Sequence, residues 1–530
     1  MTVAAASVTV GSGHTTRVAD QPVKAQTGTS MLQTRPSPAT GSSRVQHVDV
    51  LIIGAGISGI GAAYHLTQQC PDRSFVVLDA LDGHGGTWLT HRYPGVRSDS
   101  DLFTFGYRFK PWTGSPIATS EQILSYLDEV ITENDLGARI RYQHRVKAAS
   151  WSPEDRRWTV EVVRADTGEQ VLFSTDFLWM CQGYYGHAQG YTPEWPGTGD
   201  FRGVIVHPQT WPEDLDHAGK RVVVIGSGAT AATLIPALAE QAAHVTMLQR
   251  SPTFFFARPT TNELAETLRS LDIPDEWTHE ILRRAYIAQG DELARMSVEA
   301  PEELRTMLLD AMRPLLPEGY DIDKHFNPTY RPWQQRIALL PDGDLFTAIC
   351  EGRASVVTDH IETFTENGIR LVSGELLEAD VVVTATGFDL CVFGDIAFTV
   401  DGRSVDFSKT VTYRGLMFTE LPNFAYVFGY FRHSWTLRAD LISDFVCRLL
   451  NTMREKGATT VVPTLRDEDA AMPRGPWVDP ENFNPGYLTR SLHLMPTQGD
   501  REPWRHLHEY AAERELLPAV DLEDGTLAFS

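Results

Sequence analysis

Residues 48–66 read VDVLIIGAGISGIGAAYHL, an apolar run of strand length followed at once by glycines and a run of small residues. Gly54, Gly56 and Gly59 have the G-x-G-x-x-G spacing, which permits a tight strand-to-helix turn and lets backbone N–H groups approach a pyrophosphate. The helix N-terminus adds partial positive charge at the same place. The stretch therefore predicts a dinucleotide-binding unit and a fold of the α/β class.

The next apolar run, SFVVLD, ends in Asp79, which lies 25 residues after Gly54. A carboxylate at this position can accept hydrogen bonds from both hydroxyls of a ribose and would repel a 2′-phosphate. The first unit is therefore expected to bind FAD or NAD and not NADP.

The strand–glycine–helix pattern returns in GKRVVVIGSGATAATLIPAL, residues 219–238. Gly226, Gly228 and Ala231 take the three small-residue positions there. Either match alone could be a tight turn that binds nothing, but two matches in the same context predict two nucleotide sites.

The two units differ at the strand end that faces the ribose. In the second unit the strand HVTMLQRSP ends in Gln249 and Arg250, where the first unit has Asp79. A guanidinium holds a phosphate through two parallel hydrogen bonds. The second unit is therefore predicted to bind NADPH.

The pattern between and after the fingerprints predicts the domain organisation. Residues 151–183 alternate polar and apolar side chains like a small β-meander that returns to the parallel sheet. The strand ADVVVTATGFD at 379–389 is expected to re-enter the first domain, so that the NADPH unit is inserted in a split FAD domain. The predicted divisions are a flexible tail at 1–46, the first half of the FAD-binding domain at 47–190, an NADPH-binding domain at 191–375 with a helical insert at 262–330, and the second half of the FAD-binding domain with the C-terminal region at 376–530.

Composition excludes several classes of protein. The chain has 530 residues, more than a single core of roughly 250–300 residues supports. Its 46 Lys and Arg against 69 Asp and Glu give a net charge of −23, a field that repels nucleic acid. The five cysteines form no C-x-x-C pair, which argues against a disulfide framework, a dithiol redox centre and a thiolate metal site.

The scattered cysteines fit a reducing cytosol and the hydropathy pattern predicts a soluble protein, so a cytoplasmic location is expected. The longest apolar runs are of strand length, so no transmembrane segment is expected. Residues 1–46 are rich in Ala, Ser, Thr, Gly and Gln and lack the apolar core of a signal peptide. They are predicted to be a solvated tail or to follow from a start site placed too early, and their four basic residues with one Asp leave a transit peptide as a weaker alternative.

The simplest function for a chain with FAD and NADPH sites is to transfer reducing equivalents from NADPH through the flavin to an acceptor. A disulfide acceptor is excluded because no cysteine pair is present, and no haem or iron–sulfur ligand set is found. Molecular oxygen remains as the common acceptor.

Two segments resemble one family of oxygen-using flavoenzymes. FRGVIVHPQTWP places Phe201, Gly203, His207 and Trp211 at the spacing F-x-G-x-x-x-H-x-x-x-W-P, which is the fingerprint of type I Baeyer–Villiger monooxygenases. GGTWLTHRYPGVRSD, upstream, resembles the second signature of that family. Within the family the resemblance is greatest to the thioamide-prodrug-activating branch, through segments such as HPQTWPEDLD and SWTLRAD.

The resemblance implies a set of cofactor-binding residues. For FAD these are Gly54, Gly56, Ser58 and Gly59 at the pyrophosphate, Asp79 at the ribose, Thr87 and Trp88 beside the flavin, and Val146 at the adenine, with Asp99 as a further cofactor-binding residue. For NADPH they are Gly226, Ser227, Gly228, Ala229 and Thr230 at the pyrophosphate, with Gln249 and Arg250 at the 2′-phosphate.

The resemblance also implies the catalytic residues. The family's catalytic arginine falls on Arg336, and Asp99 is similar to the carboxylate that positions it. His207 resembles the family's linker histidine, with a purely structural histidine as the alternative. Many relatives have Lys just before the arginine where this chain has Gln335, so Arg250 is expected to carry the preference for NADPH more nearly alone.

The function implied is FAD- and NADPH-dependent Baeyer–Villiger oxidation, in which one oxygen atom of O2 is inserted beside a ketone carbonyl to give an ester or lactone, together with sulfoxidation of thioethers. A fixed cation at the flavin suits this chemistry because it stabilises negative charge on oxygen. The expected substrates are small hydrophobic ketones or sulfides, with some of their site formed by the aromatic segment 254–333. Two alternatives are a flavin-containing oxygenase of sulfides, thioamides or amines, and a flavin-binding redox sensor or NADPH oxidase that releases hydrogen peroxide.

Overall fold

The computed structural model describes residues 45–530. Residues 1–44, which hold nearly all of the tail predicted at 1–46, lie outside the described residues. Among the helices of residues 45–530, none combines length and apolarity to the degree that a membrane crossing requires.

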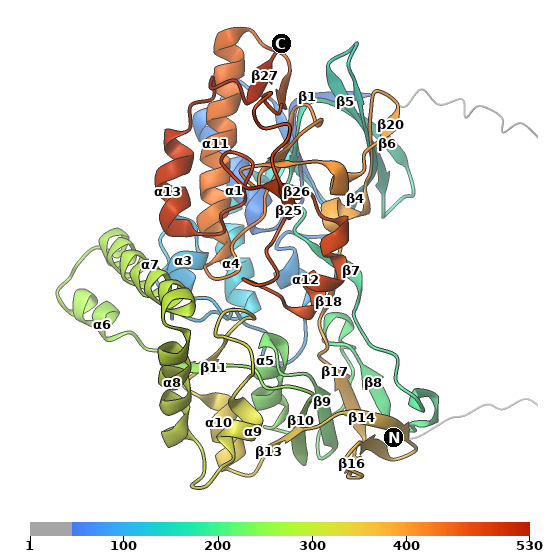
Figure 1. Ribbon diagram of the computed structural model, residues 1–530, viewed down its shortest axis with the longest axis vertical. Coiled ribbons are helices and arrows are strands. Elements are labelled where there is room, and N and C mark those ends of the chain that lie inside the picture. The colour runs from blue at the N-terminus through green and yellow to red at the C-terminus, as the bar shows by residue number, and fades with distance from the viewer. Residues whose placement is uncertain (1–44) are drawn as a thin grey trace, which may run out of the picture. The chain divides into compact units, whose positions relative to one another are not determined.

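The first fingerprint begins in a nine-stranded mixed sheet (Figure 1). β1 (Gln46–Ile53) lies between two parallel neighbours, β2 (Phe75–Leu78) and β6 (Gln170–Met180). Val50, Leu51 and Ile52 of β1 are fully buried, as expected for a parallel strand that is covered on both faces.

The predicted β-meander is confirmed in this sheet. β4 (His144–Ser152) and β5 (Arg157–Arg164) pair antiparallel, as do β5 and β6, before β6 joins the parallel strands. The other members are β3 (Ile140–Arg141) beside β2, β19 (Ala397–Val400) beside β4, β20 (Arg403–Ser404) beside β19, and β23 (Phe424–Tyr426) beside β6.

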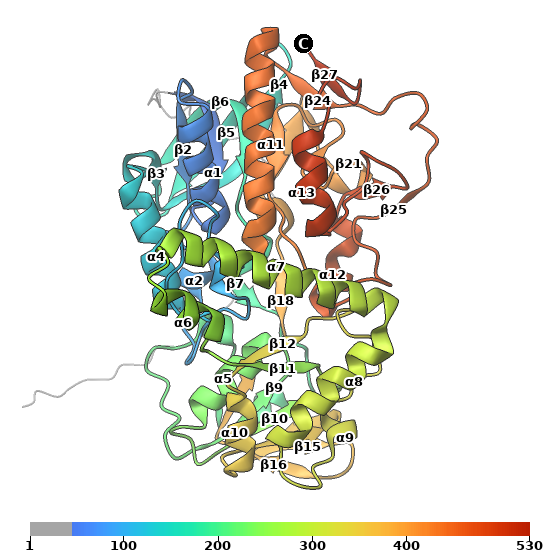
Figure 2. The same cartoon turned by 90° about the vertical axis from the view of Figure 1, so that its left-hand side faces the viewer.

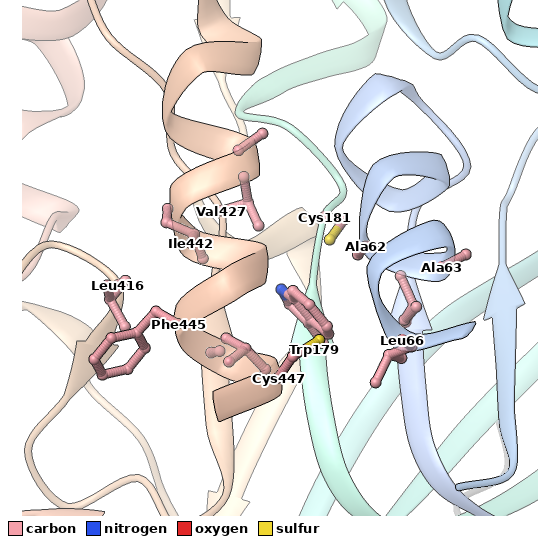
Figure 3. Close-up of a cluster of buried hydrophobic side chains, with 14 of the residues drawn as sticks. Ala62, Ala63, Leu66, Trp179, Cys181, Leu416, Val427, Ile442, Phe445 and Cys447 are labelled. Atoms are coloured by element: carbon pink, nitrogen blue, oxygen red, sulfur yellow. The ribbon is translucent and has the colours of Figure 1, made fainter. Parts of the chain in front are cut away.

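Two helices cover this sheet, α1 (Ile57–Gln69) and α11 (Trp435–Lys456). Ala62 and Ala63 on α1 are buried, and their small side chains allow close packing of the helix. Trp179 from β6 lies between the two helices, as Figure 3 shows. The small-residue composition that marks the fingerprint helix is thus also what allows this packing.

The second fingerprint begins in a separate five-stranded parallel sheet. Its strand order is β13 (Ala354–Thr358), β10 (His244–Gln249), β9 (Arg221–Ile225), β17 (Val381–Thr384) and β8 (Val204–Val206). α5 (Ala229–Leu238) and α10 (Asp344–Cys350) pack against it. The two Rossmann-like units predicted from the sequence are therefore both present.

The placement of β17 corrects the sequence analysis. The strand at 379–389 was expected to re-enter the first domain, but β17 pairs parallel with β8 and β9 of the second sheet. The chain returns to the first sheet with β19, which pairs with β4, and later with β23, which pairs with β6. An apolar, Val-rich strand that ends in glycine fits a buried parallel position in either sheet, so its pattern could not distinguish them. The division predicted at 376 falls before a strand of the second sheet.

Two linker strands join the sheets. β7 (Tyr185–Gly190) leads from β6 towards β8, and β18 (Phe388–Leu390) leads from β17 back towards β19; the two pair antiparallel. Helices occupy the segment in which a helical insert was predicted, and Figure 2 shows α7 running between the two sheet units. These helices are α6 (Glu263–Ser270), α7 (Asp275–Glu299), α8 (Pro301–Met312) and α9 (Ile322–Phe326).

The remaining elements are short or lie at the margins of these units. They are α2 (Thr87–Thr90), α3 (Leu102–Phe105), α4 (Ser120–Glu133), β11 (Phe255–Arg258), β12 (Ala338–Pro341), β14 (Ile361–Thr365), β15 (Gly368–Leu371), β16 (Leu376–Glu378), β21 (Thr412–Tyr413), β22 (Met417–Phe418), β24 (Val461–Pro463), β25 (Arg474–Pro476), α12 (Gly486–Ser491), β26 (Thr497–Gly499), α13 (Tyr510–Ala519) and β27 (Leu527–Phe529).

Candidate active site

A cavity extends from the first fingerprint to Arg336. The C-terminal ends of β1 and β6 open into it, as expected because ligands of parallel sheets bind at the carboxyl edge. Of the residues predicted to bind FAD, all but Gly59 line this cavity; they are Gly54, Gly56, Ser58, Asp79, Thr87, Trp88, Asp99 and Val146.

The glycines of the first turn are required by its geometry. Gly54 has φ +105°, and a Cβ there would lie 2.6 Å from the carbonyl oxygen of Cys181. A Cβ on Gly59 would collide with the carbonyl oxygen of Gly54, so Gly59 serves the close packing of helix on strand and not the cavity wall. α1 begins at the cavity with neither a side-chain cap nor an acidic residue in its first turn, which suits an anion.

Asp79 is buried and both of its carboxylate oxygens are engaged. Oδ2 accepts the N–H of Ala55 at 2.6 Å and Oδ1 accepts the N–H of Leu81 at 2.8 Å. Burial raises the pKa of Asp79, and these two hydrogen bonds oppose the rise. A carboxylate has about four lone-pair sites, so acceptor capacity remains for a ribose.

Arg336 and Asp99, 237 residues apart in the sequence, form an ion pair inside the cavity. Arg336 Nη2 donates to Asp99 Oδ2 at 2.7 Å, and the two side chains are 37% and 23% exposed. The charge of Asp99 raises the pKa of Arg336 further above its ordinary value, against the effect of burial, so the guanidinium stays charged.

Separate elements hold the two members of this pair. Arg336 lies just before β12, which pairs with β11, while the segment of Asp99 is tied down by the N–H of Ser98, which donates to the carbonyl of Ala118 at 2.9 Å. Arg97, two residues before Asp99, forms a 2.7 Å ion pair with Asp344 of α10.

The second fingerprint lies outside this cavity and repeats the same turn. Gly226 has φ +126°, and a Cβ there would collide with the carbonyl oxygen of Ala385. α5 begins at Ala229 without a side-chain cap, and nothing lies within 4 Å of a Cβ built on Gly228. Two of the residues predicted at the pyrophosphate have neighbours within the protein. Ser227 Oγ lies 2.8 Å from Thr253 Oγ1, and Thr230 lies close enough to Tyr93 to oppose the rise that burial causes in the pKa of that phenol.

The two residues predicted at the 2′-phosphate have different environments. Gln249 is 2% exposed, and its Nε2 donates to the carbonyl of His325 at 2.7 Å and to Thr358 Oγ1 at 2.9 Å. Both of its amide hydrogens are therefore used within the protein. Arg250 is exposed. The structure thus leaves Arg250, and not the side chain of Gln249, to meet a phosphate.

His207 connects both linker strands. Its Nδ1 accepts the N–H of Gln209 at 3.1 Å, which leaves Nε2 protonated to donate to the carbonyl of Gly387 at 3.1 Å. A Cβ on Gly190, at the end of β7, would collide with its ring. Burial lowers the pKa of His207, so the ring is neutral at physiological pH.

The other motif residues near His207 pack in the second unit. A Cβ on Gly203 would collide with the carbonyl oxygen of Asp380 and with the ring of Phe201, which explains the glycine. Phe201 packs edge-on against Phe364, and Trp211 packs against the core of the second sheet.

Several cavity residues were not predicted from the sequence. Tyr184 and Tyr185 follow the end of β6, Tyr430 and His433 precede α11, and Trp435 begins it; all five line the cavity. The position of the first two directly after a buried strand was the signal that could have identified them.

The aromatic segment 254–333 contributes no residue to the lining of this cavity. Phe254 is buried with Leu304 and Leu308, and Tyr330 and Trp333 pack against the same cluster. Within the described residues these aromatic side chains therefore belong to a helical core, as apolar stripes on helices usually do.

Comparisons with known proteins agree with this geometry. Residues 116–266 match the family model "Flavin-binding monooxygenase-like", and residues 52–127 match "NAD(P)-binding Rossmann-like domain". The FAD-containing monooxygenase EthA of Mycolicibacterium smegmatis is 46% identical over 487 residues, which cover 92% of this chain and 97% of that protein.

Solved structures share the fold. An oxidized steroid monooxygenase bound to NADP superposes with a TM-score of 0.70 at 23% identity, covering 91% of this chain and 99% of that one. An open structure of cyclohexanone monooxygenase gives a TM-score of 0.70 at 20% identity, covering 92% of this chain and 100% of that one.

The fold and the site are those of a flavoprotein monooxygenase with two Rossmann-like domains. Because EthA matches at 46% identity over nearly the full length of both proteins, the chain belongs to the EthA-like family of FAD-containing monooxygenases. The family predicted from the fingerprints is thereby confirmed.

Proposed function

We propose that this protein uses NADPH, FAD and O2 to insert one oxygen atom beside the carbonyl of a hydrophobic ketone, giving an ester or lactone. The observation that carries the proposal is the 2.7 Å ion pair of Arg336 and Asp99 in the cavity that the first fingerprint opens into. The name of one structural neighbour, a cyclohexanone monooxygenase, supports a ketone as substrate.

The two cofactors are assigned to the two fingerprints. FAD would be held by the turn at Gly54, the uncapped N-terminus of α1, Asp79 and the α2 residues Thr87 and Trp88, and when bound it supplies the oxygen-activating chemistry. NADPH would bind at the N-terminus of α5, with Arg250 at its 2′-phosphate. The domain division follows, with the first sheet as the FAD unit and the second sheet as the NADPH unit.

Arg336 supplies a permanent positive charge at the reacting oxygen. As oxygen adds to a carbonyl carbon, negative charge develops on the carbonyl oxygen, and a fixed guanidinium stabilises that charge without transferring a proton. Asp99 holds the guanidinium in place and keeps it charged. The aromatic wall around Tyr184 and Trp435 suits an apolar substrate body and excludes water from it.

Oxidation of sulfides at the same site is a second candidate. The same aromatic wall would accept an aryl alkyl sulfide, and sulfur oxidation generates no oxyanion on the substrate that would require Arg336. The EthA-like relatives and the flavin-binding monooxygenase model are compatible with either reaction.

Product mass spectrometry under ¹⁸O2 tests the proposal. The purified holoenzyme is supplied with NADPH and, in turn, 2-alkanones, phenylacetone, cyclohexanone and thioanisole. One ¹⁸O atom in an ester or lactone supports Baeyer–Villiger oxidation, and labelled sulfoxide without any ester supports the heteroatom oxygenase. Hydrogen peroxide equal to the NADPH consumed, with every substrate, would contradict both.

A further inference from the structure

A cluster of three tyrosines lies beside Arg336, and the hydroxyl groups of these tyrosines have no role in the chemistry described above. The Tyr184 hydroxyl donates to the Tyr185 hydroxyl at 2.9 Å, and both residues line the cavity with Arg336. Tyr487 of α12 lies next to them, with its ring 5.8 Å from that of Tyr185 and 6.4 Å from that of Tyr184. Tyr184, Tyr185 and Tyr487 are called the tyrosine cluster below.

The rings of the cluster are fixed relative to the flavin-binding helix. Tyr184 stacks on Trp435 with centroids 5.3 Å apart and planes 11° from parallel. Trp435 Nε1 in turn donates to Ser58 Oγ of α1 at 2.7 Å. Tyr185 packs against Phe388 at 4.4 Å. A hydroxyl held this way is preorganised, since its ring loses little freedom when a ligand binds.

The cluster is neutral and rich in donors. Burial raises the pKa of all three phenols, and the nearby charge of Arg336 lowers them only in part. The bond from Tyr184 to Tyr185 uses one of the three O–H protons. Tyr185 accepts that bond and so keeps its own proton, while Tyr487 lies close enough to both neighbours to influence the pKa of each phenol. The O–H of Tyr185 can therefore donate to an acceptor that enters the cavity.

We propose that the tyrosine cluster, through the O–H of Tyr185, binds the oxygen atom of the substrate carbonyl and so selects oxygen acceptors over hydrocarbons and sulfides of the same shape. Tyr184 and Tyr487 position the Tyr185 hydroxyl. This inference rests on the proposed function, because it concerns the substrate of that same cavity. A site with buried donors discriminates against a ligand without an acceptor, because such a ligand leaves the donors unpaired.

Equilibrium binding to the oxidised holoenzyme, without NADPH, tests the proposal in the absence of turnover. The probes are phenylacetone and 2-methyl-3-phenylpropene, in which a methylene group replaces the carbonyl oxygen, and each Kd is read from the change in flavin absorbance. Tyr185→Phe keeps the ring and removes the donor. We expect it to raise the Kd of phenylacetone about 5- to 10-fold and to leave that of the alkene within about twofold.

Further variants locate the effect. Tyr487→Phe should raise the ketone Kd less than Tyr185→Phe does, because Tyr487 acts through its neighbours. Tyr64→Phe is the matched control, since Tyr64 stacks on Phe109 outside the cavity, and it should change neither Kd. In turnover, Tyr185→Phe should lower kcat/KM for phenylacetone and leave that for thioanisole nearly unchanged.

Equal changes for the ketone and the alkene, or an unchanged ketone Kd, would overturn the inference. Failure of the wild-type enzyme to prefer phenylacetone over the alkene would do so as well. The proposed function fails separately: if the wild type forms no labelled ester, but Tyr185→Phe still weakens ketone binding selectively, the donor site stands and the reaction assigned to it does not.

Discussion

Replacing Arg336 with methionine removes the charge on which the proposed reaction depends while keeping a long side chain. Loss of one preorganised donor at a developing oxyanion typically lowers kcat by about 100- to 1000-fold. Arg336 is 37% exposed, so water can partly replace its stabilising effect. We therefore expect ester formation to fall by about 100-fold, near the lower end of that range.

The assay measures NADPH consumption, hydrogen peroxide and ester in the same reaction. Because Arg336 is not assigned to NADPH binding, Arg336→Met should still consume NADPH, with hydrogen peroxide accounting for the reducing equivalents. Asp99→Asn should lower the ester yield less severely, since an amide oxygen still accepts from Arg336. Arg202→Met is the control, because Arg202 is 72% exposed and forms its 2.9 Å ion pair with Glu366 at the surface.

An unchanged ratio of ester to NADPH in Arg336→Met, at unchanged flavin content, would refute the role of the arginine. Loss of bound flavin in that variant would also count against it, because the ion pair would then serve mainly to hold together the two segments that carry it.

Three further perturbations test other regions of the structure. Arg250→Ala should raise the KM for NADPH about 10- to 100-fold and leave the use of NADH unchanged. Gln249→Ala should lower the Tm without altering the coenzyme preference, because its amide is hydrogen-bonded within the protein. Equal losses with both coenzymes in Arg250→Ala would contradict the assignment of Arg250 to the 2′-phosphate. Burial opposes protonation of His65, but two aspartates of α11 raise the pKa of His65 from 6.5 to about 9. The contribution of protonated His65 to the stability of the fold should therefore be complete below about pH 6.5 and be lost as the pH rises through about 9. The Tm of the wild type should fall by a few degrees between about pH 6.5 and about pH 9, and the Tm of His65→Gln should fall less. Identical dependence of the Tm on pH in the two proteins would contradict this contribution of His65. Gly190→Ala places a methyl group against the His207 ring. It should lower the rate of flavin reduction by NADPH more than it lowers the FAD content. Unchanged reduction kinetics would contradict the linker role of His207.

The nucleotide-binding turns could be predicted from the sequence because their requirements are local. Gly54 and Gly226 have positive φ and would collide with a facing carbonyl if they carried a Cβ, so the glycines mark the turn directly. The contrast between Asp79 and Arg250 is likewise local, since each follows the strand that ends beside its own fingerprint. These residues identify both units without knowledge of how the units contact each other.

The site that combines the two units could not be predicted in the same way. Arg336 and Asp99 were identified through the family resemblance alone, because nothing in their spacing brings together residues 237 positions apart. β17 was placed in the wrong sheet because a Val-rich parallel strand fits both. Tyr487 was missed because its place beside Tyr185 depends on the packing of the C-terminal region, which no local pattern records.

Contacts between the two Rossmann-like units also join the second fingerprint to the segment that carries Asp99. Gly95, four residues before Asp99, has φ +76°, and a Cβ there would lie 2.8 Å from Ala237 Cβ of α5. Tyr93 of the same segment packs against α5 beside Thr230, in the first turn of the helix where the NADPH pyrophosphate is expected. A shift of α5 on coenzyme binding would therefore press directly on the segment that leads to Asp99. Because Asp99 forms the 2.7 Å ion pair with Arg336, the segment that carries one member of this pair is in contact with the helix that begins at the second fingerprint.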